Sequence, residues 1–127
     1  MRIAIDTNRY VDFCRGDEAI VQLLQSAEEI HLPFITLGEL RAGFRAGTRA
    51  SSNERVLTQF LNSPRVDTLF ADAQTTHHYA QLFSQLRAQG TPIPTNDLWI
   101  AALVVQHNLT LVSRDQHFAH LPQLARV

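Results

Sequence analysis

The sequence predicts an α/β fold in which helices cover a central, mostly parallel sheet. Short apolar runs alternate with longer segments of helical spacing, the order that parallel βαβ units produce. The runs Ile3–Ile5 and Leu109–Val112 are apolar throughout, as expected for central strands that are buried on both faces. A chain of 127 residues has the size of one ordinary domain, and we predict a single domain over residues 1–127.

The individual elements follow from apolar spacing and from the residues that stop each run. Pro33, Pro64 and Gly90 mark three of the element ends. Thr36 and Glu39 have the spacing of a capping box, which predicts that a helix begins at about Leu37. In chain order we predict strands at residues 2–5, 30–32, 66–70 and 109–112, and helices at 10–27 (interrupted at 16–17), 37–45, 53–61, 71–89 and 96–107.

The composition excludes several classes of protein. The single cysteine, Cys14, cannot form an internal disulfide, which fits a reducing cytosol. Asp6 interrupts the first apolar stretch, so no secretory signal is visible. The longest apolar run, Trp99–Val105, is much shorter than the roughly 20 residues that cross a bilayer. We therefore expect a cytoplasmic protein that has no membrane partner.

Four scattered carboxylates are the candidate site: Asp6, Glu39, Asp97 and Asp115. Asp6 and Asp115 follow predicted central strands, and ligands of parallel sheets bind beyond the carboxyl ends of the strands. Glu39 and Asp97 lie in the first turns of predicted helices. Each acid also has a purely structural explanation as a helix cap, a capping-box partner or a turn residue. The polar neighbours Thr7, Asn8, Asn96 and Ser113 could orient the acids, and turn and cap chemistry explains them equally well.

If these acids converge, their charges need a positive partner. Four carboxylates in one cleft repel one another and raise each other's pKa. All eleven basic residues are arginine, so no lysine is available to a mechanism that needs one. A hard divalent cation is the simplest counter-ion, and oxygen ligands favour Mg²⁺ or Mn²⁺. Such a site can activate water and stabilise a phosphodiester during transfer.

The segments that carry these acids resemble a known family. IAIDTN (3–8), TLGELRAG (36–43), PTNDLWIAA (94–102) and LVSRDQHF (111–118) are similar, in order and spacing, to the PIN-domain nucleases, and among them to the VapC-type toxins of toxin–antitoxin pairs. The similarity spans essentially the whole chain. It implies a Rossmann-like α/β/α sandwich and an Mg²⁺- or Mn²⁺-dependent endoribonuclease with Asp6, Glu39, Asp97 and Asp115 as the catalytic metal site.

The resemblance has further implications for residues and partners. It places Ser113 in support of the acids, and it implies a homodimer that a VapB-like antitoxin silences through a tail in the active-site groove. Metal-dependent chemistry predicts in-line attack by water that leaves a 3′-hydroxyl and a 5′-phosphate. An apolar patch around Leu23-Leu24 or Phe44 is an alternative place for the antitoxin.

Other side chains have competing interpretations. Arg41, Arg45 and Arg49 are spaced four apart, so a continuous helix would present them to RNA phosphates; a solvated face or internal ion pairs are the alternatives. We interpret the histidines as surface or structural groups rather than zinc ligands, and the large aromatics as core or dimer contacts. These residues are His77, His78, His117, His120, Phe60, Phe83 and Trp99.

Two rival functions remain open at this level. An aspartate-based phosphotransfer domain also places an acid after its first strand, but it relies on a lysine, and Asn8 stands where one such class has a second aspartate. A non-catalytic PIN-like domain that binds RNA or acts as a scaffold would keep the fold without turnover. The complete set of acids favours an enzyme.

Overall fold

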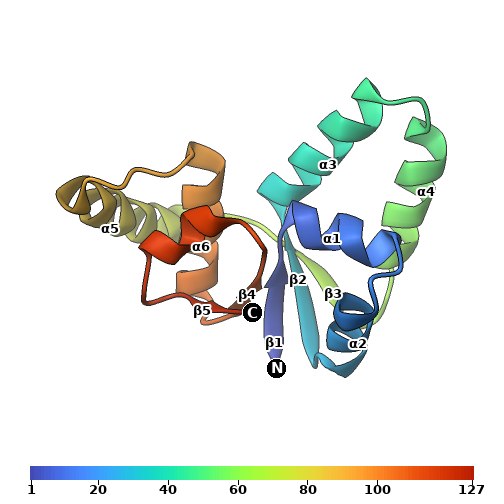
Figure 1. Cartoon of the computed structure of the whole chain (residues 1–127), viewed down its shortest axis with the longest axis horizontal. Coiled ribbons are helices and arrows are strands. Elements are labelled where there is room, and N and C mark those ends of the chain that lie inside the picture. Colours follow the sequence, from blue (N-terminus) through green and yellow to red (C-terminus); the bar gives the residue numbers. More distant parts are fainter.

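Five strands form one all-parallel sheet in the order β3-β2-β1-β4-β5, in a computed structural model that describes residues 1–127 (Figure 1). The prediction of a mostly parallel sheet is confirmed. The strand β5 was not predicted, because two residues are too few to show a pattern. The strands are β1 (Arg2–Ile5), β2 (Glu29–Pro33), β3 (Val66–Leu69), β4 (Thr110–Val112) and β5 (Ala125–Arg126).

Helices cover both faces of this sheet, as the sequence predicted. Alternation along β1 shows why: Ile3 and Ile5 pack with α1 to α4, whereas Ala4 between them packs with α5 and α6. The two groups of helices lie on opposite sides of the strands in Figure 1. The helices are α1 (Thr7–Cys14), α2 (Glu18–Ser26), α3 (Phe34–Ala46), α4 (Ala50–Leu61), α5 (Ala73–Gln89), α6 (Thr95–Gln106) and the short 3₁₀ helix η1 (Gln116–His120).

The helices α5 and α6 pack tightly on each other, and α6 is the most deeply buried of the helices. Of the eight residues of α6 from Asp97 to Val104, all except Trp99 are buried. Gly90 closes α5 in the left-handed conformation (φ 72°), which glycine adopts without steric cost. No helix of the structure combines the length and the apolar character needed to cross a membrane.

The predicted capping box at Thr36 is wrong. The helix α3 begins at Phe34, directly after β2, with Pro33 as its N-cap and no side-chain cap. Thr36 is therefore the third residue of the helix, where its hydroxyl is buried and finds no hydrogen-bond partner. The spacing of Thr36 and Glu39 led to the wrong helix start because β2 runs directly into α3, which leaves no loop residue that could act as a side-chain cap. Glu39 consequently lies in the second turn and is not used for capping.

The strand order changes direction between β1 and β4. The chain first adds β2 and β3 on one side of β1, and it then adds β4 on the other side. Ile5 pairs in register with Val112, and the backbone N–H of Asp6 donates to the carbonyl of Val112 at 3.0 Å. The residues that come after β1 and β4 thus emerge side by side at the position where open parallel sheets bind ligands.

Candidate active site

Asp6 lies at the centre of the site, where it is almost completely buried. It is the N-cap of α1: one carboxylate oxygen accepts a hydrogen bond from the backbone N–H of Thr7 at 2.8 Å. The other oxygen accepts from the hydroxyl of Ser113 at 2.7 Å. Asp6 therefore serves as a cap and also belongs to the cluster of acids, so the two interpretations of this residue are compatible.

Glu39 reaches the same place from α3. One carboxylate oxygen accepts a hydrogen bond from the hydroxyl of Thr7 at 2.8 Å, and the other accepts from the amide of Asn96 at 3.5 Å. Thr7 begins α1 and Asn96 lies in the first turn of α6. The three helices α1, α3 and α6 thus converge on Glu39 at the edge of the sheet.

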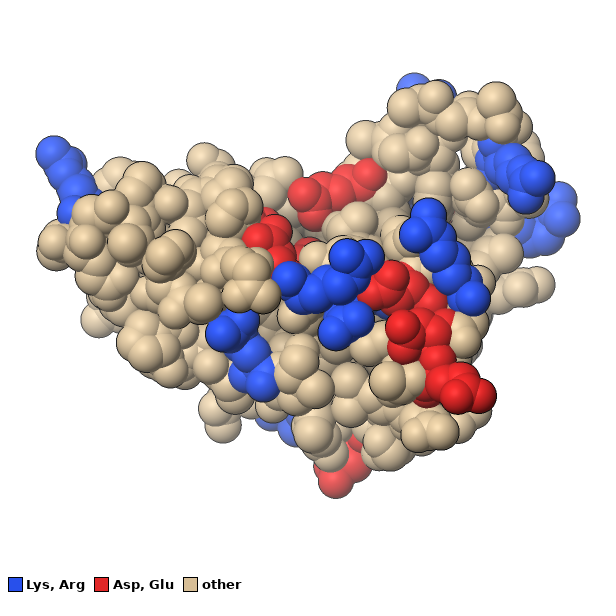
Figure 2. Space-filling model, in the orientation of Figure 1, with Lys and Arg blue, Asp and Glu red and all other residues tan.

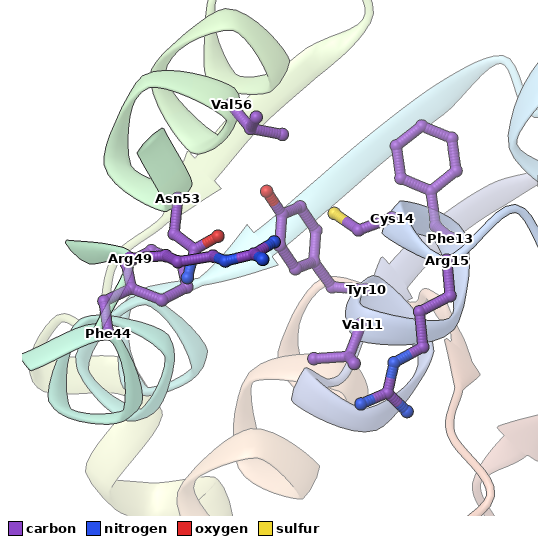
Figure 3. A pocket seen from close by; sticks show the side chains of 9 residues that line it. All are labelled: Tyr10, Val11, Phe13, Cys14, Arg15, Phe44, Arg49, Asn53 and Val56. Atoms are coloured by element: carbon purple, nitrogen blue, oxygen red, sulfur yellow. The ribbon is translucent and has the colours of Figure 1, made fainter. Parts of the chain in front are cut away.

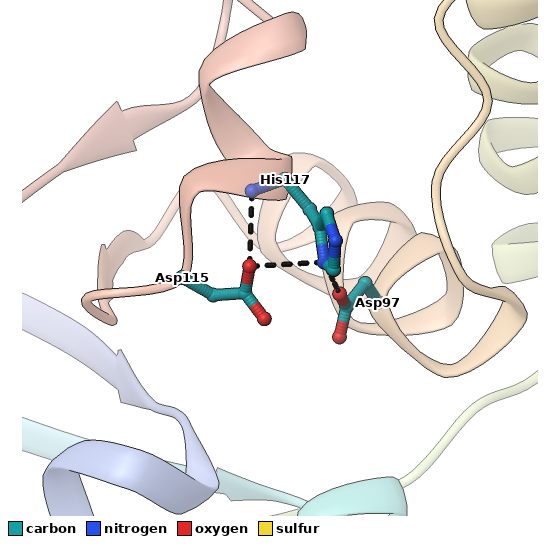
Figure 4. Close-up of side chains that lie close together, drawn as sticks. All are labelled: Asp97, Asp115 and His117. Atoms are coloured by element: carbon teal, nitrogen blue, oxygen red, sulfur yellow. Dashed lines mark hydrogen bonds and ion pairs between the residues drawn. The ribbon is translucent and has the colours of Figure 1, made fainter.

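Asp97 and Asp115 form a second part of the site together with His117 (Figure 4). The ring Nδ1 of His117 lies 2.8 Å from a carboxylate oxygen of Asp97 and 2.9 Å from one of Asp115. The backbone N–H of His117 also donates to Asp115 at 3.0 Å, because Asp115 is the N-cap of η1. One ligand atom from each of these three residues lies within 4.8 Å of the other two.

The charges of the acids act on one another. Burial raises the pKa of Asp6 above its usual value of 3.8, and repulsion from Glu39 and Asp115 adds to this rise. Burial also raises the pKa of Asp97, to which repulsion from Asp115 and Asp6 contributes. The hydrogen bond to Asp97 raises the pKa of His117, and repulsion between the acids is eased where the ring lies between them. Without a cation, the protein holds two of its buried carboxylates at an electrostatic cost.

The residues present fit a divalent cation. Potential ligand atoms of Asp97, Asp115 and His117 lie within 4.8 Å of one another, and Asp6 and Glu39 lie outside this group. Asp6 is close enough to repel Asp97 and Asp115, and Glu39 repels Asp6. Carboxylate oxygens are the hard donors that Mg²⁺ and Mn²⁺ prefer. The separations of 2.8 and 2.9 Å from Nδ1 of His117 to Asp97 and Asp115 are ion-pair distances, so these three side chains already lie within reach of one ion. A cation there would also remove the repulsion that raises the pKa values of Asp6 and Asp97.

The predicted supporting residues all lie within this network. Ser113 connects Asp6 to Asp115, since its hydroxyl also accepts from the backbone N–H of Asp115 at 3.1 Å. The amide of Asn8 donates to Ser113 at 3.4 Å, and its carbonyl accepts from the backbone N–H of Arg114 at 3.2 Å. Asn8 therefore holds the loop after β4 against the start of α1.

The predicted arginine edge is interrupted between Arg45 and Arg49. Arg41 donates twice to Glu54 of α4, at 2.8 and 3.3 Å, which is the internal ion pair that the sequence left open as an alternative. Arg45 lies in the last turn of α3, and Arg49 precedes α4 beyond the break at Gly47. Arg41 and Arg45 line one surface pocket and Arg49 lines others, and contact of the three residues with RNA stays a prediction.

Arg49 instead lines a groove of about 740 Å³ between α1, α3 and α4 (Figure 3). Six of its nine lining residues are hydrophobic, and Phe44 is among them. In the other predicted patch, Leu23-Leu24, the side chain of Leu24 is buried in the core and is not available to a partner. The residues that line the groove are Tyr10, Val11, Phe13, Cys14, Arg15, Phe44, Arg49, Asn53 and Val56.

His117 is the residue whose position sequence reasoning missed. We interpreted it as a surface or structural histidine, yet it contacts two of the four acids. Its place two residues after Asp115, at the start of η1, could have signalled this. His77, His78 and His120 belong to no group of three or more potential metal ligands, and their surface or structural role stays a prediction.

Comparisons with known proteins agree with this geometry. The family model for the PIN domain matches residues 3–124. Ribonuclease VapC4 of Mycobacterium tuberculosis is 33% identical over 90 residues, which are 71% of this chain and 69% of that protein.

Solved structures give the same result over the full length. The structure of VapBC-1 from nontypeable Haemophilus influenzae aligns with a TM-score of 0.88 and 25% identity, covering 100% of this chain and 97% of that one. VapBC2 from Rickettsia felis, bound to a DNA fragment from their promoter, aligns with a TM-score of 0.85 and 27% identity over 100% and 98% of the two chains. The chain therefore belongs to the PIN domain family, in the branch that contains the VapC ribonucleases.

Proposed function

We propose that this protein is a divalent-metal-dependent endoribonuclease that acts as the toxin of a toxin–antitoxin pair. The observation that supports the proposal is the gathering of Asp6, Asp97 and Asp115, with Glu39 acting on Asp6, beyond the carboxyl ends of the neighbouring strands β1 and β4. Relatives named as VapC ribonucleases supply the substrate class. The site has no lysine and no second aspartate two residues after Asp6, which phosphotransfer through an aspartate would use.

Asp6, Glu39, Asp97 and Asp115 would hold the cation, which we propose to be Mg²⁺ or Mn²⁺. When bound, such an ion lowers the pKa of water and neutralises charge that develops on a phosphodiester. The residues of the chain supply the geometry for this. Ser113 and the N–H of Thr7 fix both oxygens of Asp6, while the hydroxyl of Thr7 and the amide of Asn96 fix Glu39. Fixed acids cost no reorganisation during the reaction.

We propose hydrolysis by in-line attack of water, with one of the acids positioning that water. The ribose 2′-hydroxyl takes no part, so the products carry a 3′-hydroxyl and a 5′-phosphate. Mapping of RNA ends after cleavage tests this point. A 2′,3′-cyclic phosphate would contradict it, because that product requires attack by the 2′-hydroxyl.

The activity itself is tested with purified protein and a panel of tRNA and structured RNAs in Mg²⁺, Mn²⁺ or EDTA. We expect cleavage that EDTA abolishes and that both Asp6→Asn and Asp97→Asn lose. The exposed Asp67 in β3 offers a matched control, and Asp67→Asn should cleave as the wild type does. Binding without cleavage over the whole panel would support the scaffold alternative instead.

We also propose that a VapB-like antitoxin binds the groove between α1, α3 and α4. Solved relatives are described as VapBC complexes. The groove has an apolar floor that includes Phe44 and Val56, and Arg15 and Arg49 line it as well. This pattern fits an amphipathic segment whose apolar side enters the groove and whose acidic residues meet the two arginines.

A homodimer and a cytoplasmic location complete the proposal. Phe83 is half exposed and stacks on Tyr79, which in turn contacts Trp99, so the dimer contact is the favoured interpretation of this aromatic group. We propose that residues 1–127 act as one domain in this assembly. The molar mass of the purified protein by light scattering tests the dimer, and Phe83→Asp should shift it to the monomer.

A further inference from the structure

A pair of arginines is anchored next to the acids by a carboxylate that does not belong to their cluster. Asp12 of α1 accepts two hydrogen bonds from Arg114, from Nε at 2.9 Å and from Nη2 at 3.1 Å. It also accepts one from Nη1 of Arg9, one helical turn earlier, at 3.1 Å. The two guanidiniums hold the pKa of Asp12 below its usual value, so Asp12 is charged at neutral pH.

The position of Asp12 is unfavourable for the helix alone. It lies in the last turn of α1, where the helix dipole disfavours a negative charge and favours a positive one. A residue that breaks a local preference in this way indicates another use. Stability gives a weak reason, because ion pairs with an exposed arginine contribute little. The bidentate geometry, in contrast, fixes the plane and direction of the Arg114 guanidinium.

Arg114 retains donors for a ligand. A guanidinium has five N–H groups, and Asp12 uses one on Nε and one on Nη2, which leaves both on Nη1 and one on Nη2. The side chain is 54% exposed, whereas that of Asp12 is 14% exposed. Arg114 therefore presents free N–H donors to solvent, while its two hydrogen bonds to Asp12 fix the orientation of the guanidinium.

The sequence neighbours of Arg114 place it at the edge of the acidic site. It follows Ser113, which bonds Asp6, and it precedes Asp115. Its own backbone N–H is held by Asn8. In Figure 2, basic side chains border the hollow in which acidic side chains are visible. A strand of RNA whose scissile phosphodiester meets the acids would run past the loop that carries Arg114.

We propose that Arg114 binds a backbone phosphate of the RNA beside the scissile phosphodiester, and that Asp12 is a positioning residue that orients Arg114 for this contact. The inference rests on the proposed function. Planar guanidinium groups bind phosphate through paired hydrogen bonds, which requires a fixed orientation. Asp12 supplies that orientation, although its own charge repels RNA.

The two contributions of Asp12 predict opposite effects, and Asp12→Asn separates them. If the carboxylate acted only as a negative charge, its removal would strengthen RNA binding and lower KM. If it positions Arg114, its removal raises KM several-fold while kcat changes little. Arg114→Gln should raise KM about tenfold and lower the slope of log affinity against log salt concentration by about 0.7, the value for one phosphate contact on a single strand.

Binding is measured by fluorescence anisotropy on a labelled poly(U) oligonucleotide, with every variant in the cleavage-deficient Asp6→Asn protein. Steady-state cleavage of a tRNA mixture is measured in the otherwise wild-type protein. Arg87→Gln on α5 removes one exposed positive charge that forms no ion pair with the acids, and it is the matched control. Arg114→Lys keeps the charge but loses the paired hydrogen bonds, and it serves in place of Asp12→Asn if thermal melting shows that this variant does not fold.

The outcomes distinguish this inference from the proposed function. If the wild-type protein neither cleaves nor binds RNA, the proposed function fails. If it cleaves RNA, but Arg114→Gln has the KM and salt slope of Arg87→Gln, only the role of Arg114 is overturned. Tighter binding and a lower KM in Asp12→Asn would overturn the positioning role.

Discussion

The hydroxyl of Ser113 donates a 2.7 Å hydrogen bond to Asp6 across 107 positions of sequence. The bond joins the ends of the adjacent strands β1 and β4, which are in register through Ile5 and Val112. The same hydroxyl accepts from the backbone N–H of Asp115. One small side chain thus sets the position of two acids of the site.

Replacement of Ser113 should reduce activity more than stability. Ser113→Ala removes a hydrogen bond that lowers the pKa of Asp6, so Asp6 becomes harder to ionise and less well oriented. Loss of such a supporting contact typically reduces metal affinity or activity by about 10- to 100-fold. Ser113→Thr keeps the hydroxyl and should retain most of the activity. Equal RNA cleavage rates for Ser113→Ala and the wild type would contradict this role.

Asp6→Asn should stabilise the metal-free protein while it abolishes cleavage. The pKa of Asp6 is raised in the folded state, so the folded protein binds more protons than the unfolded chain from about the usual pKa of 3.8 up to the raised value. Stability is therefore lost as the pH rises through this window. At pH 7 the variant should melt roughly 4 °C higher, the shift that about 1 kcal/mol produces in a domain of this size.

The pH dependence supplies the control for this prediction. Below the usual aspartate pKa, both folded and unfolded wild-type proteins carry a neutral Asp6, so the advantage of the variant should disappear. Asp67→Asn tests for a general effect of a lost negative charge. A melting temperature of Asp6→Asn below that of the wild type at pH 7, with EDTA present, would count against a strained carboxylate at this position.

Mg²⁺ or Mn²⁺ should raise the melting temperature of the wild-type protein. A ligand that binds only the folded state stabilises by RT ln(1 + [L]/Kd), or about 2.7 kcal/mol at 100 times Kd. The increment should shrink at acidic pH, because protons compete for the carboxylates. Asp97→Asn should lose most of it, and EDTA should reverse it. A metal-independent melting curve for the wild-type protein would argue against the proposed cation.

Arg65→Ala should lower stability without affecting RNA cleavage. Nη1 of Arg65 donates to the carbonyls of Leu24, Gln25 and Ala27, where α2 ends and no helical partner remains. The loss of these charged hydrogen bonds should cost about 1 to 2 kcal/mol in chemical denaturation. Normal kcat and KM at a temperature where the variant stays folded are the second half of this prediction.

Val56→Asp should separate the antitoxin groove from the active site. Val56 is 46% exposed and lines the groove, and none of the four acids does. A negative charge there opposes both the apolar side and the acidic residues of the proposed partner. We expect normal RNA cleavage that the cognate antitoxin no longer inhibits, measured with the neighbouring gene product. Full inhibition of Val56→Asp would place the antitoxin elsewhere.

Local patterns carried much of the fold. Helical spacing, the apolar runs of buried strands and Gly90 at the end of α5 depend only on residues that are close in sequence, so the sequence alone predicts them. The same locality explains the failure at Thr36. Its spacing to Glu39 matched a capping box, but Pro33 had already begun the helix, and Glu39 bonds with Thr7 and Asn96 instead.

The candidate site likewise has a part that the sequence predicts and a part that depends on contacts between distant residues. The sequence by itself determined the α/β class and the four acids as candidates. Asp6 and Asp115 follow from the rule that parallel strands bring the residues at their carboxyl ends to one edge of the sheet, whereas Glu39 and Asp97 rested on the resemblance to the family. Only the tertiary structure decided that Glu39 is not a capping residue, that His117 lies between Asp97 and Asp115, and that Arg41 pairs with Glu54. Apart from the local contact of His117 with Asp115, those contacts join residues 13 to 57 positions apart, and they depend on how helices pack and rotate against the sheet. The hydrogen bond between Asp6 and Ser113 depends on both kinds of information. The sequence located the ends of β1 and β4, and packing set the register between these two strands.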